Sequence, residues 1–320
     1  MVMESRNPNF PENMDILPSS RPRGILHDHQ LGSDVFGTQA QEDAIRDYGI
    51  AGRVWEAAYA LISYIHPPSQ WEVEPPFIPD PSKREPFSII ELGSGVGIVA
   101  ASIAERLETN GDDLIIATDL PEICPLLERN LAESNNRIRA VAPSRNGDLV
   151  IIRPLSWGNI QEGLEIISEL CNGNNSLTHI ICSDLVYFPE LLAPLLRTLL
   201  QLTSTNDHER APVSVIISYK LRSPTKEIPF WSAFGLWFSF EPVIFNDKQT
   251  KSGWQRFGAS LDDVIFIFVA HRRADSFEWN IPTNDHDLLS GVGARGTASR
   301  KEDDTFESLL LMSLEEDIPE

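Results

Sequence analysis

A glycine-rich loop between an apolar run and a helical pattern constrains the fold of this chain more than any other feature. The run 88–92 predicts a buried strand, and apolar residues at helical spacing predict a helix over 98–107. Between them stand Gly93, Gly95 and Gly97. Glycines remove the Cβ atoms that would hold a ligand away from the backbone, and the helix start offers unpaired N–H groups. The segment predicts a cradle for a nucleotide-like ligand.

The spacing of the loop separates two classes of ligand. A dinucleotide-binding loop has the pattern G-x-G-x-x-G, whereas this chain has G-x-G-x-G and places Ile98 where that pattern has its last glycine. The spacing favours S-adenosylmethionine and disfavours a nicotinamide-dependent oxidoreductase. Glu91, two residues before the first glycine, can organise polar contacts around the cationic methionine end of such a ligand.

A second predicted strand, over 113–118, ends at Asp119. A carboxylate at the end of this strand can accept hydrogen bonds from both ribose hydroxyls of a nucleoside. The alternative is that Asp119 caps the following helix, since the sequence Asp-x-Pro also favours a helix start.

Strand and helix patterns alternate along the rest of the chain. This alternation predicts an α/β fold with a mainly parallel sheet, helices on both faces and a ligand beyond the carboxyl ends of the strands. The further strands are expected at 149–152, 178–184, 213–219, 241–245 and 264–269, the last able to insert antiparallel.

The two ends of the chain differ in composition from its middle. Residues 1–40 are rich in proline, serine and asparagine and predict a flexible segment, and 41–273 carry the predicted domain. Residues 274–320 turn polar and acidic and predict a mostly flexible tail, with a short amphipathic helix over 306–314. The polar stretch 135–148 and the proline-dense stretch 67–86 predict loops.

Charge and cysteine content exclude several functions. The formal net charge of −21 disfavours a nucleic-acid partner, because that affinity depends on Lys and Arg neutralising phosphates. None of the three cysteines forms a CxxC pair, and His27 and His29 stand without further ligands, so no metal site is predicted. No targeting or membrane segment is visible, and we expect a cytoplasmic or nuclear protein.

Several separated motifs follow one another along the chain. They are Val54-Trp55-x-Ala57-Ala58, Glu91-Leu-Gly-Ser-Gly-Val-Gly97, Thr118-Asp119, Leu155-Ser-Trp-Gly158, Ser183-Asp-Leu-Val-Tyr187 and Ser218-Tyr-Lys220. In this order they resemble a known family, the seven-β-strand protein-lysine methyltransferases grouped as methyltransferase family 16. The resemblance covers roughly residues 49–271. It implies a Rossmann-like, seven-stranded class I fold for S-adenosylmethionine-dependent methyltransferases, a three-layer αβα sandwich.

The resemblance also implies which residues hold the cofactor. In the family, a tryptophan packs near the methionine part, the glycine loop passes beneath the cofactor, a carboxylate holds the ribose and a second tryptophan lies against the adenine. Carried over one by one, these positions are Trp55, Gly93, Ser94, Gly95, Asp119 and Trp157, with Ser183 touching the adenine from the fourth strand. Tryptophans are more commonly plain core or surface anchors.

Asp184 and Tyr187 match the family motif D-x-x-Y at the end of the fourth predicted strand. Leu185 and Val186 replace the prolines with which other methyltransferases grip planar nitrogen groups. We interpret Asp184 as the group that orients and desolvates the lysine ammonium, and Tyr187 as the lining of the methyl-transfer channel. The alternative is that Asp184 caps the next helix and Tyr187 packs against it.

The sequence therefore predicts methyl transfer from S-adenosylmethionine to a lysine of a non-histone protein. The expected partner is that substrate protein, with no nucleic acid, no membrane and no metal, and the chain is expected to be a monomer. Two alternatives stay open at this point: a small-molecule N-methyltransferase, and a non-catalytic adaptor that binds S-adenosylmethionine.

Overall fold

The computed structural model describes residues 15–20, 35–79, 85–107, 112–142, 147–173, 175–204, 211–250, 253–258 and 264–315. His27 and His29 lie outside these ranges, and so does much of the segment 1–40. In the part of the chain that is described, no helix has the length and apolar character needed to cross a membrane.

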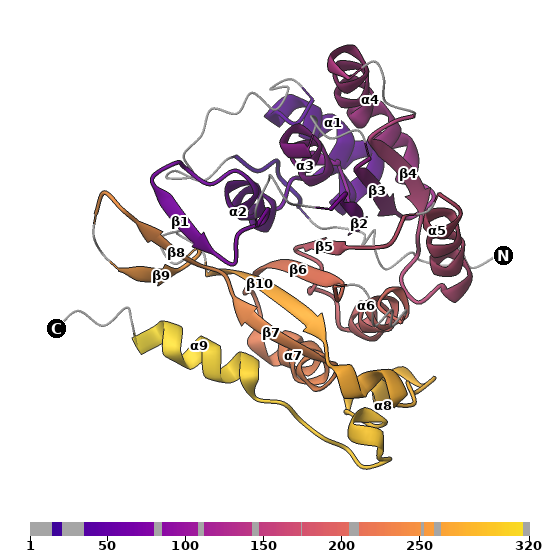
Figure 1. The fold of residues 1–320 in the computed structure, drawn as a ribbon, viewed down its shortest axis with the longest axis vertical. Helices are drawn as coiled ribbons and strands as arrows, with labels where there is room; N and C mark the ends of the chain where they lie inside the picture. Colours follow the sequence, from indigo (N-terminus) through magenta and orange to yellow (C-terminus); the bar gives the residue numbers. More distant parts are fainter. Residues whose placement is uncertain are drawn as a thin grey trace.

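A seven-stranded sheet forms the centre of the molecule (Figure 1). Its strands in spatial order are β4 (Val150–Pro154), β3 (Leu114–Asp119), β2 (Ser88–Leu92), β5 (His179–Ser183), β6 (Ser214–Lys220), β10 (Ile265–Arg272) and β7 (Phe238–Pro242). Neighbouring strands are parallel, except that β10 runs antiparallel to β6 and to β7. The predicted α/β class and seven-stranded methyltransferase fold are confirmed, including the antiparallel insertion of the last strand.

Helices cover both faces of this sheet, as a parallel sheet buried on two sides requires. On one face lie α2 (Glu56–Ile65), α3 (Ile98–Leu107) and α4 (Cys124–Val141), preceded by α1 (Thr38–Tyr48) and the 3-10 turn η1 (Gly49–Gly52). On the other lie α5 (Ile160–Asn172), α6 (Pro189–Leu202) and α7 (Pro224–Trp237). All five residues of β2 are buried, so the glycine loop leaves the sheet from its most enclosed strand.

Two predicted loops contain regular structure. Helix α4 continues through Asn135, whose side-chain amide donates to the carbonyl of Val150 (2.8 Å) and whose carbonyl oxygen accepts from its N–H (3.2 Å). The polar residue that suggested a loop is buried because it binds the edge strand. In the proline-dense stretch, β1 (Trp71–Glu74) pairs with β8 (Ile244–Asp247), which also pairs with β9 (Trp254–Arg256) in a small antiparallel sheet.

The prediction of a mostly flexible tail from residue 274 is wrong for the described residues up to 315. This stretch forms η2 (Ala274–Glu278), α8 (Asp285–Leu289), η3 (Ala294–Gly296) and α9 (Thr305–Glu315). Phe306 is fully buried and stacks on Trp231, with ring centroids 4.9 Å apart. A few buried apolar side chains hold this polar segment against the domain, and its average composition does not show that they are there. The predicted helix near 306–314 is confirmed as α9.

Candidate active site

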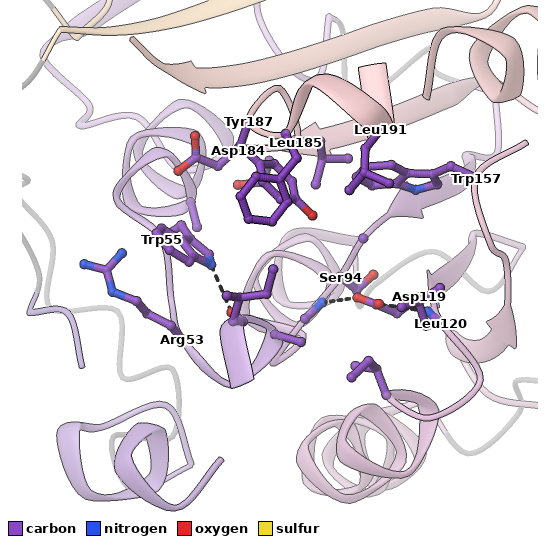
Figure 2. Close-up of a pocket in the computed structure, with 18 of the residues that line it drawn as sticks. Arg53, Trp55, Ser94, Asp119, Leu120, Trp157, Asp184, Leu185, Tyr187 and Leu191 are labelled. Atoms are coloured by element: carbon purple, nitrogen blue, oxygen red, sulfur yellow. Dashed lines mark hydrogen bonds between the residues drawn. The ribbon is translucent and has the colours of Figure 1, made fainter. Parts of the chain in front are cut away.

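A cavity of about 500 Å³ opens at the carboxyl ends of β2, β3 and β5 (Figure 2). The residues predicted to act in catalysis or cofactor binding all line it. They are Trp55, Glu91, Gly93, Ser94, Gly95, Asp119, Trp157, Ser183, Asp184 and Tyr187. Their individual roles stay predictions, but the structure brings residues from five separate motifs to one place.

The glycine loop approaches the opposite wall of this cavity closely. Gly93 and Gly95 have φ angles of 58° and 54°, a conformation that residues with a Cβ rarely adopt. A Cβ on Gly93 would lie 2.8 Å from a methyl carbon of Leu185 and 3.1 Å from the Trp157 ring. A Cβ on Gly95 would lie 3.0 Å from the carbonyl oxygen of Ala51. Both the backbone conformation and these close contacts therefore favour glycine at the two positions.

Asp119 fastens the loop rather than the next helix. Its carboxylate accepts a hydrogen bond from the N–H of Gly95 and another from the N–H of Leu120, both at 2.8 Å. Helix α4 has Ile123 as its N-cap residue, so Asp119 does not cap it. Burial raises the pKa of Asp119 to about 6, although the two amide hydrogen bonds act in the opposite direction. The carboxylate keeps lone pairs for a ligand hydroxyl group.

Glu91 presents a buried carboxyl group to the cavity. Its side chain lies on β2, its Oε2 atom has no hydrogen-bond partner among the described residues, and burial raises its pKa to about 8. The negative charge of Asp119 contributes to this rise. The hydroxyl of Ser183 is also buried, and within the described part of the chain it has no hydrogen-bond partner. Unsatisfied buried groups of this kind fit a polar, positively charged ligand, and the donor set therefore suits S-adenosylmethionine.

Aromatic and aliphatic side chains line the part of the cavity beside the glycine loop. The rings of Trp157 and Tyr187 meet edge to face with centroids 6.4 Å apart, and Leu185 lies near both. Burial raises the pKa of the Tyr187 phenol, with the charges of Asp119 and Asp184 adding to the rise. Tyr187 therefore stays neutral over the physiological pH range.

At the other end of the cavity, Asp184 is engaged by an arginine that the sequence analysis did not select. Arg222 donates two hydrogen bonds to the carboxylate, Nη1 to Oδ1 at 2.7 Å and Nη2 to Oδ2 at 2.5 Å. The Asp184 side chain is only 1% exposed, and its φ of 64° places it in the left-handed region. Helix α6 has Phe188 as its N-cap, so the capping alternative for Asp184 does not hold. Burial is the largest influence on the pKa of Arg222 and lowers it, but the hydrogen bond to Asp184 and the negative charges of Asp184, Glu56 and Glu227 together make the net shift upward.

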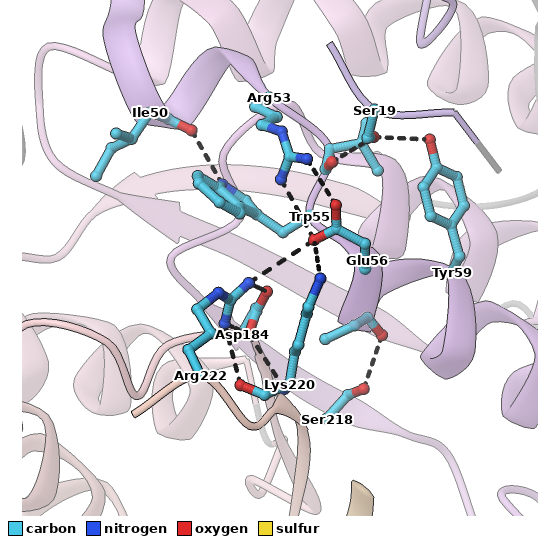
Figure 3. Close-up of polar contacts among 12 residues, drawn as sticks. Ser19, Ile50, Arg53, Trp55, Glu56, Tyr59, Asp184, Ser218, Lys220 and Arg222 are labelled. Carbon is cyan, nitrogen blue, oxygen red and sulfur yellow. Dashed lines mark hydrogen bonds and ion pairs between the residues drawn. The ribbon is translucent and has the colours of Figure 1, made fainter. Parts of the chain in front are cut away.

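A charged cluster surrounds Trp55 at this end (Figure 3). Glu56 pairs with Arg53 at 2.6 Å, and its second oxygen lies 3.6 Å from the Lys220 ammonium and 3.8 Å from the Arg222 guanidinium. The two guanidinium groups lie 4.3 Å and 5.4 Å from the Trp55 ring centroid. Burial raises the pKa of Glu56, yet the hydrogen bond from Arg53, a backbone hydrogen bond and the positive charges of Arg53 and Lys220 together make the net shift downward. We call Arg53, Glu56, Asp184, Lys220 and Arg222 the ion-pair cluster.

Arg53, Glu56 and Arg222 were not predicted as site residues from the sequence. A local signal existed for the first two, which flank the Trp55 motif three residues apart, the spacing at which helix side chains meet. Arg222 follows the carboxyl end of β6, the edge at which ligands bind in such sheets. Among the described residues, no cluster of three or more His, Cys, Asp or Glu side chains could hold a metal ion.

Solved structures of methyltransferases resemble parts of this chain. An O-methyltransferase family protein from Burkholderia thailandensis gives a TM-score of 0.41 at 9% identity, covering 80% of this chain and 65% of that one. The rRNA methyltransferase aviRa from Streptomyces viridochromogenes gives a TM-score of 0.39 at 12% identity, covering 80% of this chain and 98% of that one.

Sequence comparison gives the family. The chain is 27% identical over 177 residues to the protein-lysine N-methyltransferase EFM6 of Saccharomyces cerevisiae. This match covers 54% of the chain and 65% of the yeast protein, just under two thirds of that protein's length. A family model described as lysine methyltransferase matches residues 37–233, which is more than half of the chain and includes all ten predicted site residues. The chain therefore belongs to the lysine methyltransferase family.

Proposed function

We propose that this protein transfers methyl groups from S-adenosylmethionine to a lysine side chain of another, non-histone protein. The observation that carries the proposal is the single cavity in which the glycine loop, Asp119 and the pair Asp184 and Tyr187 meet. When bound, S-adenosylmethionine supplies a methyl carbon made electrophilic by its positively charged sulfur. The residues of the chain have to bind and orient the two reactants and exclude water.

The loop end of the cavity suits the cofactor. The backbone at Gly93 and Gly95 allows close approach, and Asp119 can accept hydrogen bonds from ribose hydroxyls while it holds the N–H of Gly95. Glu91 is neutral near pH 7 when no ligand is bound, because its pKa lies near 8. A cationic ligand beside it favours the ionised carboxylate, so binding would release a proton.

The other end of the cavity suits an amine. A lysine must lose its proton before its nitrogen can attack, although its unperturbed pKa is about 10.4. The guanidinium groups of Arg53 and Arg222 stand at this end, and nearby cations together with burial favour the neutral amine over the ammonium. The two terminal nitrogens of Arg222 each donate to one oxygen of Asp184. To orient the amine, the same oxygens would have to accept a hydrogen bond from it while they stay bonded to Arg222.

Radiolabelled S-adenosylmethionine incubated with the purified protein and a cell lysate tests this proposal. A labelled protein band whose label resides in methyl-lysine is the expected result. Label found only in small molecules would support a small-molecule N-methyltransferase instead, and binding without transfer would support a non-catalytic adaptor. A cytoplasmic or nuclear location and a monomeric state belong to the same proposal, and imaging of the tagged protein and sedimentation test them.

A further inference from the structure

A short N-terminal segment, residues 15–20, lies against the wall of the cavity and outside the part of the chain that the family model matches. Within it Ser19 is 7% exposed, whereas Leu17 is 67% exposed. A buried serine in a segment with exposed neighbours indicates a specific contact. The contacts of Ser19 lead to residues 50–55, several of which line the cavity.

Ser19 contacts this wall through its hydroxyl, as Figure 3 shows, and also through its backbone. The hydroxyl donates to the carbonyl of Val54 at 2.5 Å and lies 3.2 Å from the hydroxyl of Tyr59. The Ser19 N–H donates to the side-chain oxygen of Gln41 at 3.1 Å, and the Gln41 amide donates back to the Ser19 carbonyl at 3.2 Å. The segment is thereby joined to both α1 and the cavity wall.

Gln41 completes the attachment. Its side chain is 2% exposed, and its oxygen also accepts from the N–H of Val54 at 3.0 Å. The two backbone polar groups of Val54 are therefore satisfied by the side chains of Gln41 and Ser19. Val54 precedes Trp55 in a stretch that belongs to neither a helix nor a strand, so the conformation of this stretch depends on these side chains.

Arg53 links the segment to the Trp55 ring. Its Nε donates to the carbonyl of Leu17 at 2.9 Å, its terminal nitrogens pair with Glu56, and its guanidinium carbon lies 4.3 Å from the Trp55 ring centroid. The Trp55 indole N–H donates to the carbonyl of Ile50 at 3.1 Å. The plane of Trp55 is thus fixed by groups that residues 15–20 help to hold.

We propose that residues 15–20 act as a strap, with Ser19 as a positioning residue that holds Val54 and Trp55 in the shape that binds the methionine end of the cofactor. The inference rests on the proposed function, because the ligand is the same cofactor. Removal of the Ser19 hydroxyl leaves a buried carbonyl without its donor. We expect affinity for the amino-acid part of the ligand to fall by about 10-fold.

Calorimetry on the full chain tests the strap with two probes, S-adenosylhomocysteine and 5′-methylthioadenosine, which lacks the amino-acid part. Ser19→Ala is expected to lower the affinity for S-adenosylhomocysteine by about 10-fold and to leave the affinity for 5′-methylthioadenosine unchanged. Ser20, the exposed neighbour of Ser19, provides the matched control Ser20→Ala, which should bind both probes like the parent. Ser19→Thr keeps the hydroxyl and should restore most of the affinity.

The ratio of the two affinities within one protein sample decides the outcome even if Ser19→Ala lowers overall stability. If the affinity for both probes falls equally, or if neither affinity changes, the proposed role of the strap is wrong. The proposal that the protein binds S-adenosylmethionine would not be affected by either result. If the parent protein binds neither probe, the proposed function itself fails and the strap fails with it.

Discussion

The two ends of the cavity are built in different ways. The loop end is made mainly from one continuous segment, β2, the glycine loop and α3, fastened by Asp119. The other end is the ion-pair cluster, whose five charged side chains come from three separate parts of the chain, around residues 53–56, 184 and 220–222. The first end is encoded locally in the sequence, whereas the second exists only once the chain has folded.

The charges at the two ends behave in opposite ways. At the loop end, burial raises the pKa of Glu91 to about 8 and of Asp119 to about 6. At the other end, hydrogen bonds together with the positive charges of Arg53 and Lys220 outweigh burial, and the pKa of Glu56 falls. The carboxyl groups at the loop end can thus be ionised by a positively charged ligand, whereas the carboxylates of the ion-pair cluster are already paired with arginine and lysine side chains.

The largest expected effect comes from filling the loop end. Gly93→Val places a side chain against Leu185 and Trp157 at a φ of 58°, so we expect binding of S-adenosylhomocysteine to fall below detection in calorimetry. Gly147 also has a positive φ, 85°, but nothing lies within 4 Å of its added Cβ. Gly147→Ala is therefore the control, expected to cost about 1 kcal/mol of stability and to bind normally. If Gly93→Val binds S-adenosylhomocysteine normally, the glycine loop is not part of the cofactor site.

The buried carboxyl of Glu91 predicts a pH-dependent stability. Its folded-state pKa of about 8 exceeds the ordinary value of 4.5, so its stabilising contribution is complete below pH 4.5 and is lost as the pH rises to about 8. Relative to the parent, Glu91→Gln should gain about 1.4 kcal/mol per pH unit in this window. Chemical unfolding of both ligand-free proteins at several pH values measures the difference. A constant difference would mean that Glu91 ionises normally.

Breaking the ion-pair cluster should destabilise the fold itself. Arg222→Gln leaves the buried Asp184 carboxylate unpaired, and because Arg222 is partly exposed we expect a loss of about 2–3 kcal/mol in the free energy of unfolding. The double variant Arg222→Gln/Asp184→Asn removes both charges and should recover much of this loss. Additive losses in the double variant would show that the two residues do not act as a pair.

A smaller effect is expected at the ribose position. Asp119→Asn keeps the size of the side chain but replaces the charged carboxylate, whose oxygen accepts a hydrogen bond from the N–H of Gly95 and would accept one from a ligand hydroxyl. Affinity for S-adenosylhomocysteine should fall by about 10-fold, measured by calorimetry. The exposed Asp275 lies in η2 away from the cavity lining, and Asp275→Asn should bind like the parent. Equal affinities of Asp119→Asn and the parent would exclude a ribose contact.

Local patterns were sufficient for most strands of the sheet and for the glycine loop, Glu91 and Asp119, whereas Trp55, Trp157 and Ser183 were predicted from the family resemblance. Apolar runs mark buried strands, and parallel topology then brings their carboxyl ends together, which places Asp119 beside Gly95. The pairing of Asp184 with Arg222 was not predictable in this way, because it joins the ends of two strands through side chains 38 residues apart. The helix that contains Phe306 was predicted, but its packing against Trp231 was not, because a contact between segments distant in the sequence leaves no local pattern.

The central claim is that both ends of one cavity serve a single transfer of a methyl group to lysine. Mass spectrometry of lysate proteins incubated with the chain and S-adenosylmethionine carrying a deuterated methyl group tests it most directly, with Asp184→Asn as the comparison. The account predicts deuterated methyl-lysine with the parent and at least 10-fold less with Asp184→Asn, while both bind S-adenosylhomocysteine alike. Deuterated methyl groups on another residue type, or equal methyl-lysine from both proteins, would contradict it.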